Sequence, residues 1–201
     1  MVQLDDVKQD VLREIGNIGL GNAITALSEL DGQSYLITVP EVSQIELSEV
    51  PFLFGDPERI VVGAAALVTG DWGGHAAFMF PWESATALWT RLLGQTPEDI
   101  NALEPIYTST ISEVANIMSG AYLTAISTMT GFELMLEPPA FVADMSAAIL
   151  SSLTVEALLF DREMIAIRLQ FLTPNDDFEG FFLYLPELGG LNKLFAALGV
   201  N

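Results

Sequence analysis

The sequence predicts an α/β (α+β) fold in which helices pack on a mainly antiparallel β-sheet, with the whole unit duplicated about a pseudo-twofold axis. Two observations favour this fold. Helical stretches with amphipathic spacing alternate with short β-rich stretches that are typical of hairpins. One segment of the chain also occurs twice, 99 positions apart. The 201 residues are therefore expected to form a single domain of two repeats, about 5–94 and 105–199.

The repeated segment is short and polar. Its first copy is Asp10-Val-Leu-Arg-Glu14-Ile-Gly-Asn17 and its second is Ser109-Thr-Ile-Ser-Glu113-Val-Ala-Asn116. In both copies a proline, Pro40 or Pro139, follows the asparagine after 22 intervening residues. An ungapped alignment of residues 14–40 with 113–139 matches nine positions. This similarity indicates a duplication of one unit and not a long solenoid, since only two copies exist.

The first repeat begins with a helix over residues 5–30, for which the apolar stripe is expected at Val7, Val11, Ile15 and Ile18. Gly16, Gly19 and Gly21 are unfavourable inside a helix, and close approach of another backbone, in the fold or from a partner, would explain them. The remaining elements are expected as strands at 34–39 (stopped by Pro40) and 41–50, a loop at 51–57, a hairpin of strands 60–68 and 75–80, and a helix at 81–93.

The second repeat follows a polar linker, residues 95–104. Gly131 is expected to end its first helix, over residues 106–130, because glycine readily adopts the left-handed conformation of a helix C-terminus. The later elements are expected as a strand at 141–144, a helix at 145–159, a hairpin of strands 164–172 and 181–185, and a helix at 186–198.

Composition excludes several classes of function. The chain has no cysteine and a formal net charge of −20, with 27 acidic and 7 basic residues. Nucleic acid and anionic membranes both require cationic contacts, so neither is expected as a partner. No stretch is long and apolar enough for a membrane span, and we expect a soluble cytoplasmic protein. The scattered acidic residues resemble those of proteins from salt-rich cytoplasm, although an ordinary acidic protein remains an alternative.

Conventional catalytic groups are scarce. The single histidine, His75, cannot form a histidine metal cluster or a catalytic triad, and it is expected to be structural. The glycines at 16–21 have the wrong order for a dinucleotide loop, and no P-loop lysine is present. Asp176-Asp177 could bind a cation but fits a solvated turn better. The three tryptophans, Trp72, Trp82 and Trp89, are expected to be packing residues.

The duplicated triplet is the remaining candidate. At about 100° per residue, its polar residue, glutamate and asparagine lie within an arc of roughly 60° on one helix face. A solvated helix face, carried along by the duplication, is the alternative explanation. An asparagine is a weak base but can orient a water molecule, and a nearby carboxylate can anchor a cation. Positioning of the attacking water is the main protein task in phosphoryl-transfer hydrolysis.

The two segments resemble the motif of the CheC/CheX/FliY family of chemotaxis phosphatases, and among its members the CheC group most closely. That motif is a short polar residue, three residues, Glu, two residues, Asn, twenty-two residues, Pro. The resemblance is carried by Asp10, Glu14, Asn17 and Pro40 in the first copy and by Ser109, Glu113, Asn116 and Pro139 in the second.

The resemblance implies hydrolysis of the aspartyl phosphate of the response regulator CheY at two symmetry-related sites. It implies that Asn17 and Asn116 position water, and that Glu14 and Glu113 pair with the active-site lysine of the regulator. No metal ligand or cofactor is expected on this chain, because the Mg²⁺ belongs to the regulator. CheC proteins also bind the receptor deamidase CheD, and the corresponding region would lie around Asp144. The alternative is a non-catalytic adaptor that binds CheY or CheD, as the related middle domain of FliM binds partners.

Overall fold

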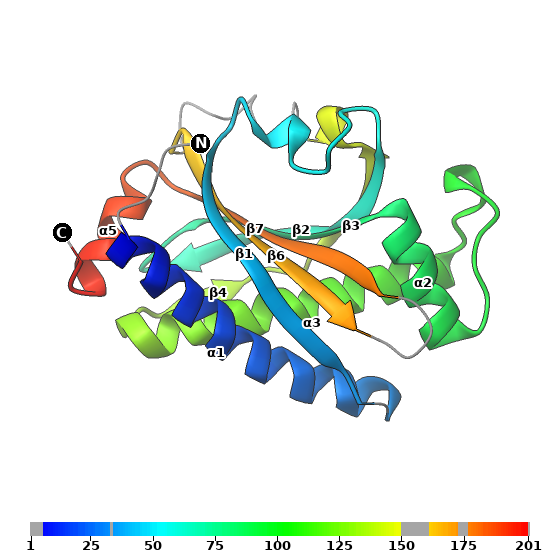
Figure 1. Cartoon of the computed structure of the whole chain (residues 1–201), viewed down its shortest axis with the longest axis horizontal. Helices are drawn as coiled ribbons and strands as arrows, with labels where there is room; N and C mark the ends of the chain where they lie inside the picture. The colour runs from blue at the N-terminus through cyan, green and yellow to red at the C-terminus, as the bar shows by residue number, and fades with distance from the viewer. Residues whose placement is uncertain (1–5, 33, 150–160, 173–176, 201) are drawn as a thin grey trace.

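The computed structural model describes residues 6–32, 34–149, 161–172 and 177–200. The chain forms helices packed on a strongly curved β-sheet (Figure 1). The elements are α1 (Asp6–Asp31), β1 (Leu36–Glu46), η1 (Val50–Phe52), β2 (Ile60–Gly70), β3 (Gly74–Pro81), α2 (Trp82–Leu93), η2 (Ile100–Ala102), α3 (Pro105–Thr130), β4 (Leu134–Leu136), β5 (Ala140–Met145), β6 (Glu163–Leu172), β7 (Phe178–Pro186) and α5 (Gly190–Ala197). The predicted fold class is confirmed.

The order of the strands shows the pseudo-twofold symmetry. Six of the seven strands in the described chain follow the order β1-β6-β7-β3-β2-β4, and the seventh, β5, also pairs with β2. All of these pairings are antiparallel. The β3–β7 pair lies at the centre, where Phe78 is opposite Phe182. Outward from this central pair the strands occur in equivalent order on both sides, so that β2 corresponds to β6, and β4 and β5 together correspond to β1.

The two repeats are interlocked through their first strands. Strand β1 of the first repeat pairs with β6 of the second, and β4 and β5 of the second repeat pair with β2 of the first. Each repeat therefore completes its hairpin with a strand from the other repeat. This exchange joins the halves through backbone hydrogen bonds as well as through side-chain packing.

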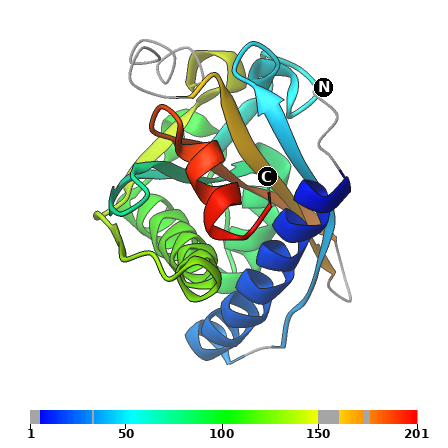
Figure 2. The ribbon, with the colours of Figure 1, turned by 90° about the vertical axis from the view of Figure 1, so that its left-hand side faces the viewer.

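Helices α1 and α3 lie side by side and antiparallel over one face of the sheet, as the two ribbon views show (Figures 1 and 2). The main hydrophobic core fills the space between these helices and the sheet. Alternate residues of a strand point to opposite faces. Accordingly Phe182 and Tyr184 of β7 belong to this core, whereas Leu183 and Leu185 belong to a second core on the other face.

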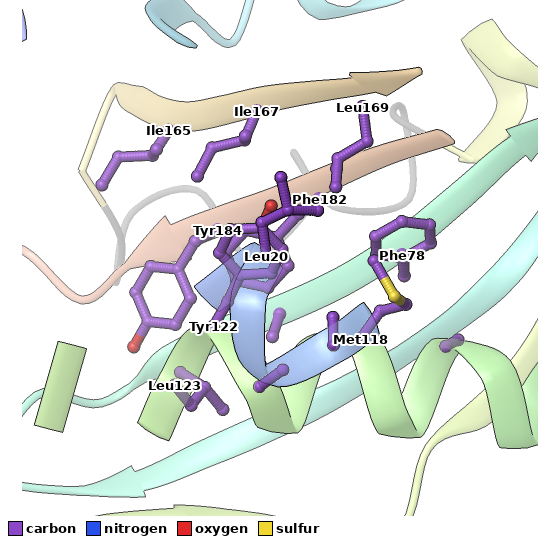
Figure 3. Packing of buried hydrophobic residues seen from close by; sticks show 14 of the residues in the cluster. Leu20, Phe78, Met118, Tyr122, Leu123, Ile165, Ile167, Leu169, Phe182 and Tyr184 are labelled. Atoms are coloured by element: carbon purple, nitrogen blue, oxygen red, sulfur yellow. The ribbon is translucent and has the colours of Figure 1, made fainter. Parts of the chain in front are cut away.

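The two long helices approach each other closely at Gly19. A Cβ atom on Gly19 would lie 2.7 Å from Cδ1 of Tyr122 on α3, closer than real side chains come. Tyr122 in turn stacks on Phe182 of the sheet, with ring centroids 4.7 Å apart (Figure 3). A Cβ atom on Gly16 would lie 3.4 Å from Cγ1 of Val39 on β1, which is an ordinary contact. Close packing within the fold therefore explains Gly19 but does not require glycine at position 16.

Replacement of Tyr122 by phenylalanine is expected to stabilise the protein. Burial raises the pKa of the Tyr122 hydroxyl, and that hydroxyl has no hydrogen-bond partner among the described residues. An unsatisfied buried polar group costs about 1–3 kcal/mol, so Tyr122→Phe should raise the free energy of unfolding by about 1 kcal/mol. Urea denaturation followed by circular dichroism measures this change. Tyr184→Phe is the matched control and should destabilise, because the Tyr184 hydroxyl donates to the Trp72 carbonyl at 2.7 Å.

Several predicted boundaries were wrong. Pro40 does not end a strand: β1 is continuous through it, with a shift of register between Thr38 and Glu41. The final helix begins at Gly190 and not at residue 186, because Pro186 ends β7 and Gly189 turns the chain with a φ of 80°. On α1, Val7 is exposed, and the buried stripe is formed by Leu12, Ile15, Leu20, Ala23 and Leu27.

The helix predicted at 145–159 can be judged only at its start. Met145 is the last residue of β5 and residues 146–149 are helical, whereas residues 150–160 lie outside the described chain. No helix of the described residues is long and apolar enough to cross a membrane.

Candidate functional site

The four predicted site residues lie on the two long helices. Glu14 and Asn17 are exposed on α1, and Glu113 and Asn116 are exposed on α3. None of these four side chains makes a hydrogen bond or an ion pair with another residue of the described chain. Their carboxylate and amide groups are therefore available to a partner at the outer surface of the helical layer.

Both helices end with the same capping arrangement. Gly32 and Gly131 occupy equivalent positions in the repeats and have φ values of 69° and 75°. The Gly32 amide donates to the Ser28 carbonyl at 2.9 Å, and the Gly131 amide donates to the Ser127 carbonyl at 2.8 Å. Glycine adopts this left-handed conformation without steric cost. The duplicated glycine thus makes each helix end at the same distance from its Glu/Asn pair.

The two motif prolines lie where the neighbouring strand is interrupted. Pro40 is at the register shift of β1, and Pro139 is in the gap between β4 and β5. Proline has no N–H and cannot donate to the ladder at these points. Val39, directly before Pro40, contacts the position of Gly16, directly before Asn17. At the first site, the interrupted strand therefore lies beside the turn of helix that carries the asparagine.

The two asparagines lie on opposite sides of the point where the helices cross. Gly19 faces Tyr122 there, and because the helices are antiparallel, Asn17 and Asn116 are displaced from the crossing in opposite directions. With a rise of 1.5 Å per residue, the two asparagines are about 12 Å apart along the helix axes. The two Glu/Asn pairs therefore occupy separate places on the surface and do not share one centre.

The surroundings of the two sites differ in charge. At the first site Asp10 lies 4.0 Å from Arg13 in an exposed ion pair. At the second site the Ser109 hydroxyl donates to the Pro105 carbonyl at 2.6 Å. Glu113 is the only charged residue of α3. An exposed ion pair contributes little and is screened by salt. On α3 itself, Glu113 is therefore the single charge beside the second asparagine.

A groove of about 550 Å³ opens beside the second site. It lies between the ends of α1 and α2 and the start of α3, and its lining includes Ser109 and Glu113 together with Leu30, Arg91, Leu92 and Leu93. The Arg91 guanidinium lies 4.3 Å from the centre of the Tyr35 ring and donates to the Ser34 carbonyl at 3.2 Å. Sequence reasoning missed Arg91, because it belongs to the predicted α2 helix and no motif connects it with α3.

The other residues that the sequence offered as candidates lie outside the Glu/Asn motif. Trp72 and Trp89 are fully buried, and each donates its indole N–H to a backbone carbonyl, of Gly190 and Tyr107 respectively. His75 is half-buried in β3. Asp176 lies outside the described residues. Within the described chain, no group of three or more histidine, aspartate or glutamate residues is arranged to hold a metal ion.

Asp144, the predicted contact for CheD, lies at an exposed position in β5. One of its carboxylate oxygens accepts a hydrogen bond from the Met145 amide at 2.7 Å. It belongs to the sheet and not to the helices of the Glu/Asn pairs, so any partner that binds there would use a different surface.

The sequence model of the CheC-like family matches this chain in two segments, residues 7–43 and 106–143. Each segment contains one Glu/Asn pair and ends beyond its proline. Over these two segments the chain is similar to the CheC-like family. The resemblance that was recognised in the duplicated motif is thereby confirmed, and the two matched segments are the corresponding parts of the two repeats.

Individual proteins are similar to this chain in sequence or in fold. The CheY-P phosphatase CheC of Bacillus subtilis is 27% identical, over 98% of this chain and 97% of the relative. The crystal structure of FliY from Thermotoga maritima superposes with a TM-score of 0.75 at 19% identity, over 99% of this chain and 98% of that one. CheX of Borrelia burgdorferi, solved with CheY, BeF3 and Mg²⁺, has a TM-score of 0.52 at 15% identity, over 86% and 98%.

Proposed function

We propose that the protein is a chemotaxis phosphatase that hydrolyses the aspartyl phosphate of a CheY-type response regulator at two sites, one on each long helix. The observation that carries this proposal is the exposure of two equivalent Glu/Asn pairs, Glu14 with Asn17 and Glu113 with Asn116, on helices that are related by the internal repeat. The CheC relative, which aligns with this chain over nearly its whole length, is named a CheY-P phosphatase.

The amide of Asn17 or Asn116 would hold the attacking water in line with the phosphorus atom. The water oxygen forms a bond to phosphorus while the bond from phosphorus to the aspartyl oxygen breaks, which yields inorganic phosphate and a free carboxylate. The aspartate leaves as an anion, and the water loses its proton to solvent or to a phosphate oxygen. Such a reaction needs little covalent help, so orientation of the water supplies much of the acceleration.

The carboxylates of Glu14 and Glu113 would bind a cation of the regulator, its active-site lysine. Each is one helical turn from its asparagine, on the same face. A carboxylate that is free of partners in the unbound protein can form a charge-assisted hydrogen bond without first breaking another. The Mg²⁺ ion of the reaction would be held by the regulator, and this chain would contribute no ligand to it.

Replacement of both glutamates by glutamine tests this role. Glu14→Gln with Glu113→Gln keeps the size of each side chain but removes its charge, so it should weaken binding of the phosphorylated regulator. We expect KM to rise about tenfold, equivalent to about 1.4 kcal/mol, with a smaller change in kcat. The measurement is the rate of phosphate release from phosphorylated CheY at several CheY concentrations. Glu29→Gln, an exposed change further along α1, is the matched control.

The wild-type protein decides the proposal itself. Phosphorylated CheY that loses phosphate at the same rate with and without the protein would refute it. Tight binding to CheY without faster phosphate loss would favour the alternative, a non-catalytic adaptor. Binding of the deamidase CheD at the surface of Asp144 is a separate proposal, for which Asp144→Lys and a direct binding measurement are the test.

A further inference from the structure

Gly21 and Gly120 occupy equivalent positions in the two repeats, four residues after Asn17 and Asn116. Both lie inside long helices, where glycine is the poorest residue after proline. Neither has a positive φ, since the glycines with positive φ are at other positions. Their backbone conformation is therefore open to any residue, and an alanine would favour the helix.

Packing within the chain gives no reason for these two glycines. A Cβ atom built on Gly21 or on Gly120 meets nothing within 4 Å among the described residues, apart from the neighbouring backbone of its own helix. Gly19, two residues before Gly21, is different, because there a Cβ would lie 2.7 Å from Tyr122. The same helix thus contains one glycine that the fold requires and one that the fold does not require.

The glycines lie beside the proposed catalytic asparagines. Four residues advance a helix by about 6 Å and rotate it by about 40°, so each glycine is one turn from its asparagine on nearly the same face. Gly120 also opens into a groove of about 300 Å³ between α3 and β4, which Thr124, Leu134 and Leu136 help to line. Each asparagine therefore has, one turn further along its helix, a position from which no side chain projects.

The carbonyl group at each glycine is already satisfied by a side chain of the same helix. The Thr25 hydroxyl donates to the Gly21 carbonyl at 3.2 Å, and the Thr124 hydroxyl donates to the Gly120 carbonyl at 2.8 Å. Because a carbonyl oxygen can accept two hydrogen bonds, the threonine fills the place that solvent would otherwise take. A partner could then cover this stretch of backbone without leaving a polar atom unpaired.

We propose that Gly21 and Gly120 provide steric clearance for the main chain of the phosphorylated regulator next to its phosphoaspartate, and so determine how closely each asparagine approaches the phosphorus atom. This rests on the proposed function. The phosphorylated aspartate and the asparagine both have short side chains, so water can bridge them only if the two backbones come close together. A side chain that projected from the helix one turn away would hold the backbones apart.

The test compares stability with kinetics in the full-length protein. The double variant Gly21→Ala with Gly120→Ala should raise the thermal unfolding midpoint, because alanine favours the helix. The same variant should lower kcat/KM for phosphorylated CheY about tenfold, since a displacement of about 1 Å is costly for a positioned reaction. Glutamine at both positions should lower kcat/KM further. Asn22→Ala, which also favours α1 but lies about 100° further around the helix, should leave kcat/KM unchanged.

Unchanged kcat/KM values in both the alanine and the glutamine variants, beside an active wild type, would overturn the inference and leave the proposed function intact. If the wild type itself does not accelerate phosphate loss, the proposed function fails. In that case the proposed role of the two glycines is tested by measuring the affinity of each variant for CheY, activated by BeF3 and Mg²⁺, with calorimetric titration. Weaker binding of the glutamine variant would support it, and equal binding would overturn it.

Discussion

Loss of both asparagine amides, in Asn17→Ala with Asn116→Ala, should reduce the hydrolysis of phosphorylated CheY to its spontaneous rate. Loss of a group that orients a reactant or stabilises a transition state typically costs a factor of about 10²–10³. Both side chains are exposed and make no hydrogen bond within the described chain, so their removal should not alter the free energy of unfolding by more than about 0.5 kcal/mol. The measurement is single-turnover phosphate loss at saturating protein.

The single variants separate the two sites. Because the asparagines lie about 12 Å apart along the helices, each site should act alone, and the rates lost in Asn17→Ala and Asn116→Ala should add up to the whole wild-type rate. Asn22→Ala, an equivalent truncation at an exposed position of α1, is the control and should retain full activity. Full activity in the double variant would show that neither amide positions the water.

Truncation of Trp72 should have the largest effect on stability. Trp72 is fully buried in the turn between β2 and β3, and it stacks on Tyr184 at 4.1 Å between ring centroids. Its indole N–H donates to the Gly190 carbonyl at 2.8 Å, and its carbonyl accepts from the Tyr184 hydroxyl. Replacement of a buried tryptophan by alanine costs about 3–5 kcal/mol. Urea denaturation of Trp72→Ala should show this loss.

Two companion variants test the cause of that loss. Trp72→Phe keeps most of the buried ring but removes the indole donor and leaves the Gly190 carbonyl without it, so about 1–3 kcal/mol should be lost. Trp82→Ala removes the same side chain from a half-buried position on α2 and should cost less than Trp72→Ala. Equal losses of unfolding free energy in the two alanine variants would mean that the contacts of Trp72 between the β2–β3 hairpin and the start of α5 add no stability beyond that of a half-buried tryptophan.

Local sequence signals placed the two long helices and the exposed Glu/Asn positions on them, but not the pairing of the strands. The apolar periodicity and Gly131 placed α3 within one residue of its observed start and at its observed end. The repeated Glu/Asn spacing identified exposed positions on both helices. Pro40 was misread, because a proline can remain in a strand where the register shifts. The groove beside Glu113 also could not be predicted, since Leu30, Arg91 and Glu113 come from three different helices.

The exchange of first strands between the repeats has a consequence for the synthesis of the chain. When β1 leaves the ribosome, its partner β6 is still to be made, because residues 47–162 are translated between them. The first repeat therefore has an unpaired edge in β1 and a second in β2 until the other half arrives. Such late, non-local pairing slows folding and exposes nascent chains to association with one another. During this interval, two nascent chains could exchange these strands with each other and form a dimer that has the symmetry of the finished monomer.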